Sequence, residues 1–386
     1  IVYSTDFMIT NQKTLRHPRV IALPLKTTEK SHIKVKSGDI VTIGMPLTHK
    51  TYGAYATVSG VIKAIEKING DTYVFIENDR LDQHYETLKH FSPKDLVKRY
   101  FKTYEPFESF EAKSLTQLDI PLFFRNEPFV SIDPIYIKDM ITVITDVLVK
   151  LLAIYDIKQI TLLITKDLDT RIVKPLIEKD ARIITKIIDV EREDHIYKHI
   201  NDTFNYALMH QQTYQLITLE RLLHLHELII NKRPPTMNQL IISGDMISDP
   251  TLASVRIGTT FRDVLELIGE LRKEKNYKIL VNHLLKEETI DTTEFPVEIH
   301  MHSFHLTEPI DRTVYDCISC GDCNDHCPVG IIPSKIYHAV NQKKMLNHLK
   351  PTLCIECGLC SFYCPSKIPV MAFVKEAKAL LRRKKL

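Results

Sequence analysis

The N-terminal part of the chain alternates short apolar runs with turn residues. β-Branched and aromatic residues dominate "VIALPLK", "IVTIGMPL" and "YATVSGVIKAIEKINGDTYVFIE". Gly38-Asp39, Gly60 and Asn69-Gly70 stand between or within these runs, and such residues favour tight turns between strands. The pattern predicts a small antiparallel β domain over residues 1–90, arranged as a sandwich of facing hairpins.

Beyond residue 90 the apolar spacing changes to a helical period. Ser92-Pro93 opens the first predicted helix, because Ser can cap a helix and Pro suits its first position. Apolar residues then recur at helical spacing over 135–154. Strands and helices alternate after that, which predicts an α/β layer with a partly parallel sheet over residues 91–235. The expected elements are strands at 159–165 and 182–189 and helices at 171–179 and 195–208.

A small α+β unit is predicted over residues 236–300. Two apolar runs flank the turn Gly244-Asp245, and Thr259 or Thr260 precedes a helix that begins near Arg262. A further strand is expected in "KILVNHLL". The last part, residues 301–386, contains every cysteine and ends in an amphipathic stretch. The fold class is therefore α/β, with several domains.

Charge and hydropathy exclude some classes of function. The net charge of +3 is too small to indicate nucleic acid as the main partner. No apolar run approaches the ~20 residues that span a bilayer, and no signal peptide is recognised, so we expect a cytoplasmic chain, soluble or peripheral to a membrane. The chain opens at Ile1 without Met, which is consistent with further residues before it.

The cysteines carry the clearest chemistry. All 8 belong to "CISCGDCNDHCP" or "CIECGLCSFYCP", which share the spacing C-x2-C-x2-C-x3-C-P. This concentration indicates metal in a reducing compartment and not a disulfide framework. Three thiolates of such a motif hold one cluster, and the fourth, before Pro, ligates the other. We therefore assign Cys317, Cys320, Cys323 and Cys364 to one 4Fe-4S cluster, and Cys354, Cys357, Cys360 and Cys327 to the second.

The alternative for these cysteines is a pair of zinc sites, which would leave both prolines and the repeated register unexplained. Gly321 and Gly358 follow the second cysteine of each motif, where a small residue lets the backbone turn around a cluster. His326 is next to Cys327, but the cysteines already complete both sites, so we expect it at the surface or behind the ligands. The basic end "RRKKL" is expected to be solvated.

The order of these parts resembles the RnfC family, the C subunit of ion-translocating ferredoxin:NAD oxidoreductase complexes. The resemblance covers nearly the whole chain and depends on Gly38-Asp39 with Gly44 and Leu47, Glu127-Pro128-Phe129, Ser243-Gly244-Asp245, Val255-Arg256-Ile257-Gly258-Thr259, and both cysteine motifs. It implies a barrel-sandwich (lipoyl-like) domain, a Rossmann-like core, an SLBB β-grasp unit and a dicluster ferredoxin-like helical domain, in that order. In the family the core binds flavin mononucleotide (FMN) and NADH.

The positions of glycine in this chain differ from the pattern of that family. No glycine lies between Gly70 and Gly244, so residues 101–118 lack the family's glycine-rich loop. Backbone N–H groups approach a phosphate closely only where side chains are absent. Only Glu127 and Pro128 match the family's next strand end, and residues 282–287 replace a second glycine-rich loop. We therefore expect that FMN and NADH do not bind; the competing view places Arg125 on a phosphate.

Two classes of function follow. The first is a non-catalytic electron-transfer subunit of an Rnf-like oxidoreductase complex, with two 4Fe-4S clusters between protein partners. The second is an enzyme, the NADH:ferredoxin oxidoreductase subunit that binds FMN and NADH; a narrower alternative is an RnfC-like carrier for a dedicated soluble reductase. The lack of glycine between Gly70 and Gly244 favours the first class, the electron-transfer subunit. Expected partners are other redox subunits of a membrane-bound complex, with ferredoxin or a flavoprotein as candidates, on the inner face of the cell membrane.

Overall fold

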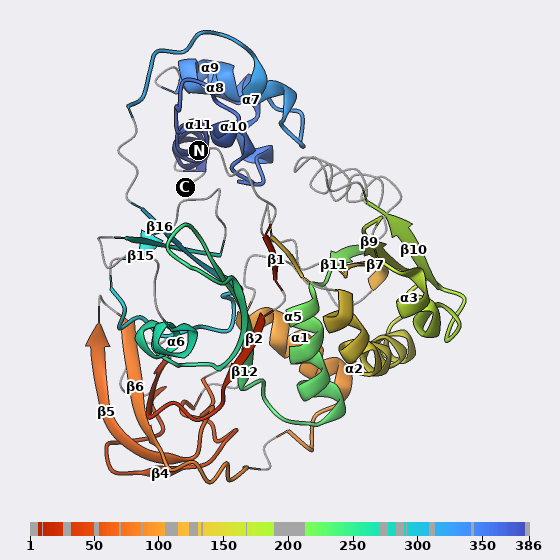
Figure 1. The fold of residues 1–386 in the computed structure, drawn as a ribbon, viewed down its shortest axis with the longest axis vertical. Coiled ribbons are helices and arrows are strands. Elements are labelled where there is room, and N and C mark those ends of the chain that lie inside the picture. The colour runs from red at the N-terminus through yellow and green to blue at the C-terminus, as the bar shows by residue number, and fades with distance from the viewer. Residues whose placement is uncertain are drawn as a thin grey trace.

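A computed structural model describes most of the chain. The described residues are 7–9, 11–25, 32–49, 54–68, 71–85, 88–104, 115–122, 130–132, 134–166, 168–188, 213–269, 277–282, 289–290, 292–308, 313–340 and 343–382. Within them, the strands form four sheets, and the C-terminal residues form a helical unit at one end of the molecule (Figure 1). The mixed α/β fold class expected from the sequence is confirmed.

The first unit is an antiparallel sheet in the order β3-β6-β5-β4. Its strands are β3 (Val20–Pro24), β4 (Ile40–Val41), β5 (Gly60–Ile68) and β6 (Asp71–Asn78). Gly60 has φ +152°, and a Cβ there would lie 1.9 Å from the Glu77 carbonyl oxygen, so the close pairing of β5 with β6 requires glycine. The antiparallel prediction is confirmed, whereas the facing-hairpin sandwich stays a prediction and Asn69-Gly70 lies outside the described residues.

The second unit is a four-stranded parallel sheet in the order β10-β9-β7-β11. Its strands are β7 (Leu115–Pro121), β9 (Gln159–Ile164), β10 (Ile183–Ile187) and β11 (Thr213–Leu216). Its helices are α1 (Pro93–Tyr104), α2 (Pro134–Ile154), α3 (Thr170–Ile177) and α5 (Leu219–Leu225), and α5 continues as η2 (His226–Ile230). The strands and helices predicted here are confirmed, except for the helix at 195–208, which lies outside the described residues.

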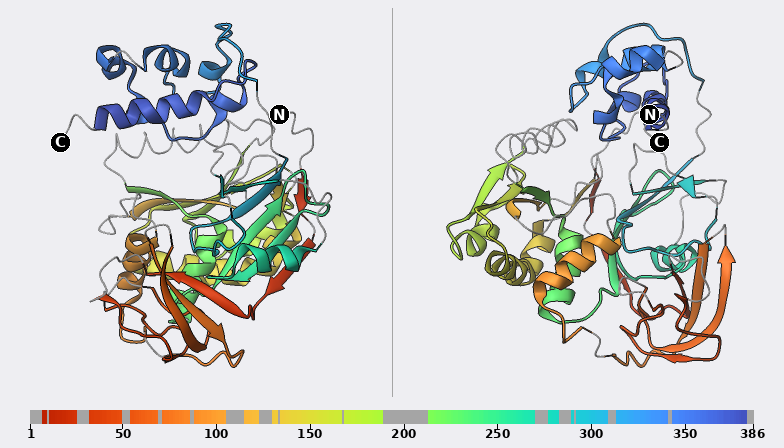
Figure 2. Two further views of the ribbon diagram at one scale, coloured as in Figure 1. Left: turned by 90° about the vertical axis from the view of Figure 1, so that its left-hand side faces the viewer. Right: turned by 180° about the vertical axis from the view of Figure 1, so that it is seen from behind.

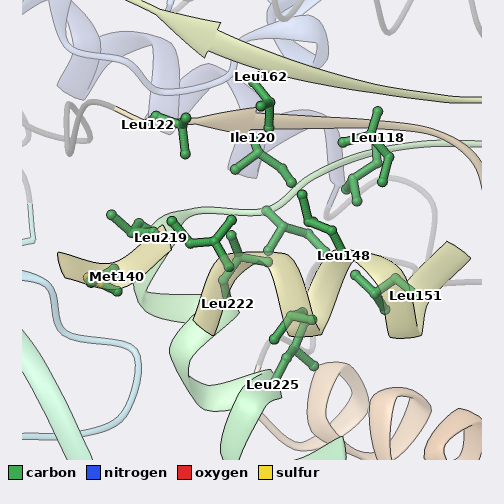
Figure 3. Close-up of a cluster of buried hydrophobic side chains, with 14 of the residues drawn as sticks. Leu118, Ile120, Leu122, Met140, Leu148, Leu151, Leu162, Leu219, Leu222 and Leu225 are labelled. Atoms are coloured by element: carbon green, nitrogen blue, oxygen red, sulfur yellow. The ribbon is translucent and has the colours of Figure 1, made fainter. Parts of the chain in front are cut away.

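The helices α2 and α5 pack their apolar side chains against this parallel sheet (Figure 3). Leu118 and Ile120 of β7 and Leu162 of β9 are fully buried and face Leu148 of α2 and Leu222 of α5. A period of two on the strands and of about 3.6 on the helices brings these side chains to one interface. The start of α1 is also as predicted, because the Ser92 hydroxyl oxygen accepts a hydrogen bond from the Asp95 N–H at 3.2 Å.

The third unit is a six-stranded sheet in the order β15-β14-β16-β12-β13-β2. The predicted strands and helix are present as β12 (Met237–Ser243), β13 (Thr251–Arg256), β14 (Lys278–Val281) and α6 (Phe261–Ile268), which Thr260 caps. Three strands of this sheet were not predicted: β2 (Asn11–Leu15), β15 (Thr289–Ile290) and β16 (Ser303–Thr307). In particular, β16 lies past residue 300 and is hydrogen-bonded between β14 and β12.

A separate short pair joins β1 (Phe7–Ile9) to β8 (Val130–Ile132) in parallel. The strands β1 and β2 therefore do not belong to the first sheet, because β1 pairs with β8 and β2 pairs with β13 of the third unit (Figure 1). Sequence patterns do not reveal such pairings, because each strand is short and its partner is more than 100 residues away.

Two sequence features of the RnfC resemblance have structural roles here. Gly244 has φ +116°, and a Cβ would lie 2.2 Å from the Leu306 carbonyl oxygen, so β16 can approach only a glycine. Arg256 is buried, and its guanidinium donates to the Arg16 carbonyl oxygen at 3.0 Å and to Asp82 Oδ1 at 3.0 Å. Arg256 therefore joins the third unit to the first.

The C-terminal unit is helical. Its elements are α7 (Asp322–Asp325), α8 (Pro333–Ala339), α9 (Lys343–Leu349), η3 (Pro351–Leu353), α10 (Leu359–Phe362) and α11 (Val370–Arg382). The long helix α11 runs beneath the shorter helices, between them and the sheets (Figure 2). Over the described part of the chain, we find no helix with the length and apolar content to cross a membrane.

Candidate iron-sulfur site

The two cysteine motifs fold in the same way. Ser319 and Glu356, one residue before the second cysteine of each motif, both have φ +59°. Gly321 and Gly358, one residue after it, have φ +91° and +84°. Each glycine carbonyl then accepts a hydrogen bond from the amide three residues on, at 2.7 and 3.0 Å. The predicted turning role of both glycines is confirmed, because their conformation disfavours any side chain.

Each motif is also joined to the helix that follows it by an equivalent side chain. Asn324 Oδ1 accepts hydrogen bonds from the backbone N–H and the hydroxyl of Ser334, at 3.1 and 3.0 Å, at the start of α8. Ser361 Oγ accepts from the N–H of Met371 at 2.9 Å, at the start of α11. These bonds satisfy amides that a helix start leaves without a partner. They fix each helix against its own motif.

The chain brings the eight cysteines together as two groups of four around two cavities. Cys317, Cys320, Cys323 and Cys364 line the first, which we name the outer site. Cys354, Cys357, Cys360 and Cys327 line the second, which we name the inner site. Each site therefore takes three cysteines from one motif and the fourth from the other.

The donor set of each cavity fits a 4Fe-4S cluster, because four thiols surround a volume walled mainly by apolar side chains. The inner site is closed by residues such as Val329, Ile331 and Val374, and the outer site by Tyr337, Ile368 and Val370. Each thiolate of such a cluster binds a different iron, so the ligands need not converge on one point. Among the residues described, no three Cys, His, Asp or Glu side chains are placed to hold a single metal ion.

The two sites differ in exposure. Cys320 of the outer site is exposed, whereas Cys360 of the inner site is buried. Burial raises the pKa of the Cys357 thiol to about 12, and it also raises the pKa of Cys360. A thiol with a raised pKa is protonated at neutral pH, so binding of a cluster at the inner site would release protons. Glu356 N–H donates to Cys354 Sγ at 3.3 Å, which directs a backbone donor at the sulfur of a candidate ligand.

His326 and Tyr363 occupy equivalent positions, each directly before the fourth cysteine of its motif. Their rings stack with centroids 3.5 Å apart and planes inclined by 16°. His326 Nδ1 is also 2.9 Å from the Asp322 carbonyl oxygen, and the residue lines the inner site. The expectation that His326 lies at the surface or behind the ligands stays a prediction. The stacked pair ties together the two segments that exchange their fourth cysteine.

Sequence reasoning missed Lys378. The ammonium of this residue on α11 is buried, donates to the Cys354 carbonyl oxygen at 2.9 Å and pairs with the Glu356 carboxylate. Nothing in the amphipathic stretch "PVMAFVKEAKALLRRKKL" distinguishes it from the other lysines of that stretch. Its burial depends on how α11 packs against the second motif.

The expected nucleotide-facing segments are only partly described. Arg125, Glu127 and Pro128 lie outside the described residues, as do 105–114 and 283–288. What the sequence predicts for these loops therefore stays a prediction.

A family model described as a 4Fe-4S dicluster domain matches residues 316–368, the segment that builds both sites. One similar protein is the C subunit of the ion-translocating oxidoreductase complex of Methanosarcina acetivorans, 26% identical over 110 residues, which cover 28% of this chain and 24% of that protein. Another is the equivalent protein of Yersinia enterocolitica, 30% identical over 127 residues, which cover 31% of this chain and 18% of that protein. The chain thus matches less than a quarter of the length of these relatives.

Among solved structures, the NAD+-reducing NiFe hydrogenase is similar in its air-oxidised and H2-reduced states. The TM-scores are 0.43 and 0.42 and the identities 10% and 11%, over 70% and 69% of this chain and 60% and 57% of the other. This is a partial likeness of fold. The two relatives in sequence agree with the family resemblance expected from the motifs.

Proposed function

We propose that this RnfC-like chain is an electron-transfer subunit of an Rnf-like oxidoreductase complex, which passes electrons between protein partners and has no FMN or NADH site of its own. When bound, two 4Fe-4S clusters supply two one-electron carriers. In this proposal Cys317, Cys320, Cys323 and Cys364 bind the cluster of the outer site, and Cys354, Cys357, Cys360 and Cys327 bind that of the inner site.

The observation that carries the proposal is the exchange of the fourth cysteine between two motifs of the same backbone conformation. This exchange is the arrangement that the C-x2-C-x2-C-x3-C-P spacing implies in two-cluster ferredoxins. It places the sites next to each other, with the stacked pair His326–Tyr363 linking the two segments. Neighbouring carriers, one exposed at Cys320 and one deeper, suit a relay from a docked partner.

The absence of a nucleotide site is proposed from the sequence. A chain without a glycine from Asp71 to Ser243 offers no loop in which backbone amides approach a phosphate freely. Glu105, Glu108 and Glu111 would repel an anionic ligand at the position of the family's glycine-rich loop. Electrons would then reach the cysteines from another protein and not from NADH bound on this chain.

The proposed partners are other redox subunits of a complex at the inner face of the cell membrane, with ferredoxin or a flavoprotein as the donor or acceptor. A pull-down from native membranes tests this part. Recovery of the chain with membrane-embedded redox subunits supports it. Recovery with a soluble reductase alone contradicts it and favours the narrower alternative of a dedicated carrier.

The central test of function is a titration of the cluster-loaded chain with NADH under anaerobic conditions, followed by dithionite. The proposal expects dithionite, but not NADH, to bleach the absorbance of the clusters. Rapid bleaching by NADH alone would refute the proposal in favour of the enzyme with its own nucleotide site. Addition of FMN before NADH extends the test to a site that had lost its flavin.

A further inference from the structure

The inner and outer sites share one backbone but differ in charge. Asp316, Asp322 and Asp325 flank the cysteines of the first motif, and the equivalent positions of the second motif hold Leu353, Leu359 and Phe362. Ser319 is likewise replaced by Glu356. The same fold around equal clusters would give equal reduction potentials, so any difference must come from these surroundings.

Lys378 is the most unusual of these surroundings. Only 7% of its surface is exposed, and lysine is rarely buried to that extent unless its charge is paired. Its ammonium reaches the Cys354 carbonyl oxygen at 2.9 Å as well as the Glu356 carboxylate. The backbone of Glu356 in turn donates to Cys354 Sγ. The lysine is thus held against the turn that carries the first ligand of the inner site.

The charges at this turn are not balanced. A second cation, Lys375 Nζ, lies 3.8 Å from the other carboxylate oxygen of Glu356, so two ammonium groups face one carboxylate. The two ammonium groups carry one more charge than the Glu356 carboxylate balances, and Lys378 also contacts the Cys354 carbonyl oxygen. The turn beside Cys354 is therefore net positive.

We propose that Lys378 raises the reduction potential of the cluster at the inner site and thereby offsets the burial of that site. This inference rests on the proposed function, since it concerns the second of the two carriers. Reduction adds one electron to a site that is already anionic, and burial in apolar surroundings opposes that added charge. A fixed ammonium nearby favours it, with little screening because the group is buried.

A higher reduction potential at the inner site favours electron transfer from the outer site to the inner site. A one-electron transfer from the outer to the inner site forms and breaks no covalent bond and needs no proton. The reductant is the reduced redox partner that docks near the outer site. The positive charge of Lys378 favours the electron at the inner site. Lys378 thus acts only through its charge on the reduction potential of the inner site, and it contacts no substrate.

The test uses the full chain, loaded with iron and sulfide, in a potentiometric titration followed by electron paramagnetic resonance (EPR). Lys378→Gln should lower one midpoint potential and leave the other unchanged, whereas Lys378→Arg should restore it. Glu356→Gln should shift the same potential upward. Lys375→Gln is the matched control on the same helix, because its ammonium is more exposed and lies farther from the Glu356 carboxylate; its shift should be smaller.

Cys320→Ser identifies the two signals, because it changes only the spectrum of the outer site. The inference is wrong if Lys378→Gln leaves both potentials unchanged, shifts both equally or shifts only that of the outer site. If Lys378→Gln does not assemble both clusters, Glu356→Gln decides, and no shift or a downward shift overturns the inference. Failure of the proposed function looks different, since NADH alone would then bleach the clusters of the unaltered chain, whatever the potentials of the Lys378 variants.

Discussion

Replacement of Cys364 by serine tests the exchange of ligands between the motifs. In sequence Cys364 belongs with Cys354, Cys357 and Cys360, but in the structure it lines the outer site with the cysteines of the first motif. Serine has nearly the same shape, so the apolar packing around Ile368 and Val370 is preserved. We therefore expect the variant to fold, to keep the inner cluster and to lose or alter the outer one.

The size of the effect follows from the number of thiols left. The outer site keeps three of four thiols after Cys364→Ser, so it loses at least the iron that Cys364 would bind and at most its whole cluster. Iron per chain should fall from about 8 to between about 4 and about 7. Cys327→Ser is the reciprocal variant, with the same loss at the inner site.

The assay combines iron and sulfide analysis with EPR of the reduced protein. Cys320→Ser and Cys357→Ser serve as references, because each removes a ligand that both sequence and structure place in one site. The spectrum of Cys364→Ser should match that of Cys320→Ser, and the spectrum of Cys327→Ser should match that of Cys357→Ser. The opposite correspondence would mean that each motif fills its own site, and the assignment would be wrong.

Three further predictions concern the fold that carries the sites. Leu222→Ala, at a fully buried position, should lower the free energy of unfolding by about 2–5 kcal/mol in denaturant titrations (Figure 3). A loss below about 1 kcal/mol would contradict the packing of α5. Gly244→Ala should cost at least about 2 kcal/mol in the same assay, because φ is +116° and β16 must move; a neutral result would mean that β16 does not pack there. The pKa of buried His224 is lowered to about 4, chiefly by burial, so the unfolded chain takes up a proton at higher pH than the folded one. Stability should therefore be complete above pH ~6.5 and fall by up to about 3 kcal/mol towards pH ~4, and His224→Gln should remove that slope; an unchanged slope would point to other groups.

The regular elements could be predicted because their patterns are local. A helical period of apolar residues identifies α2, and short apolar runs identify β9 and β10. The grouping of the cysteines also follows from spacing alone, since the motif repeats with the same prolines and the fourth cysteine is carried away from its own turn. These features depend on residues close together in the chain.

The remainder depends on tertiary contacts. β2 and β16 join the six-stranded sheet by pairing with β13 and with β12 and β14, and neither has an apolar run long enough to indicate a strand. Lys378 lies in a stretch rich in charge, and only the packing of α11 on the second motif shows that it is buried. The stack of His326 on Tyr363 likewise requires both motifs to be folded against each other.

In the function proposed above, the two clusters receive electrons from another protein and not from NADH bound on this chain. The most direct measurement is the absorbance of the loaded chain during anaerobic addition of NADH, with FMN present and absent. NADH should cause no bleaching in either case, and later addition of dithionite should bleach the clusters fully. Bleaching by NADH within the time of mixing would contradict this proposal.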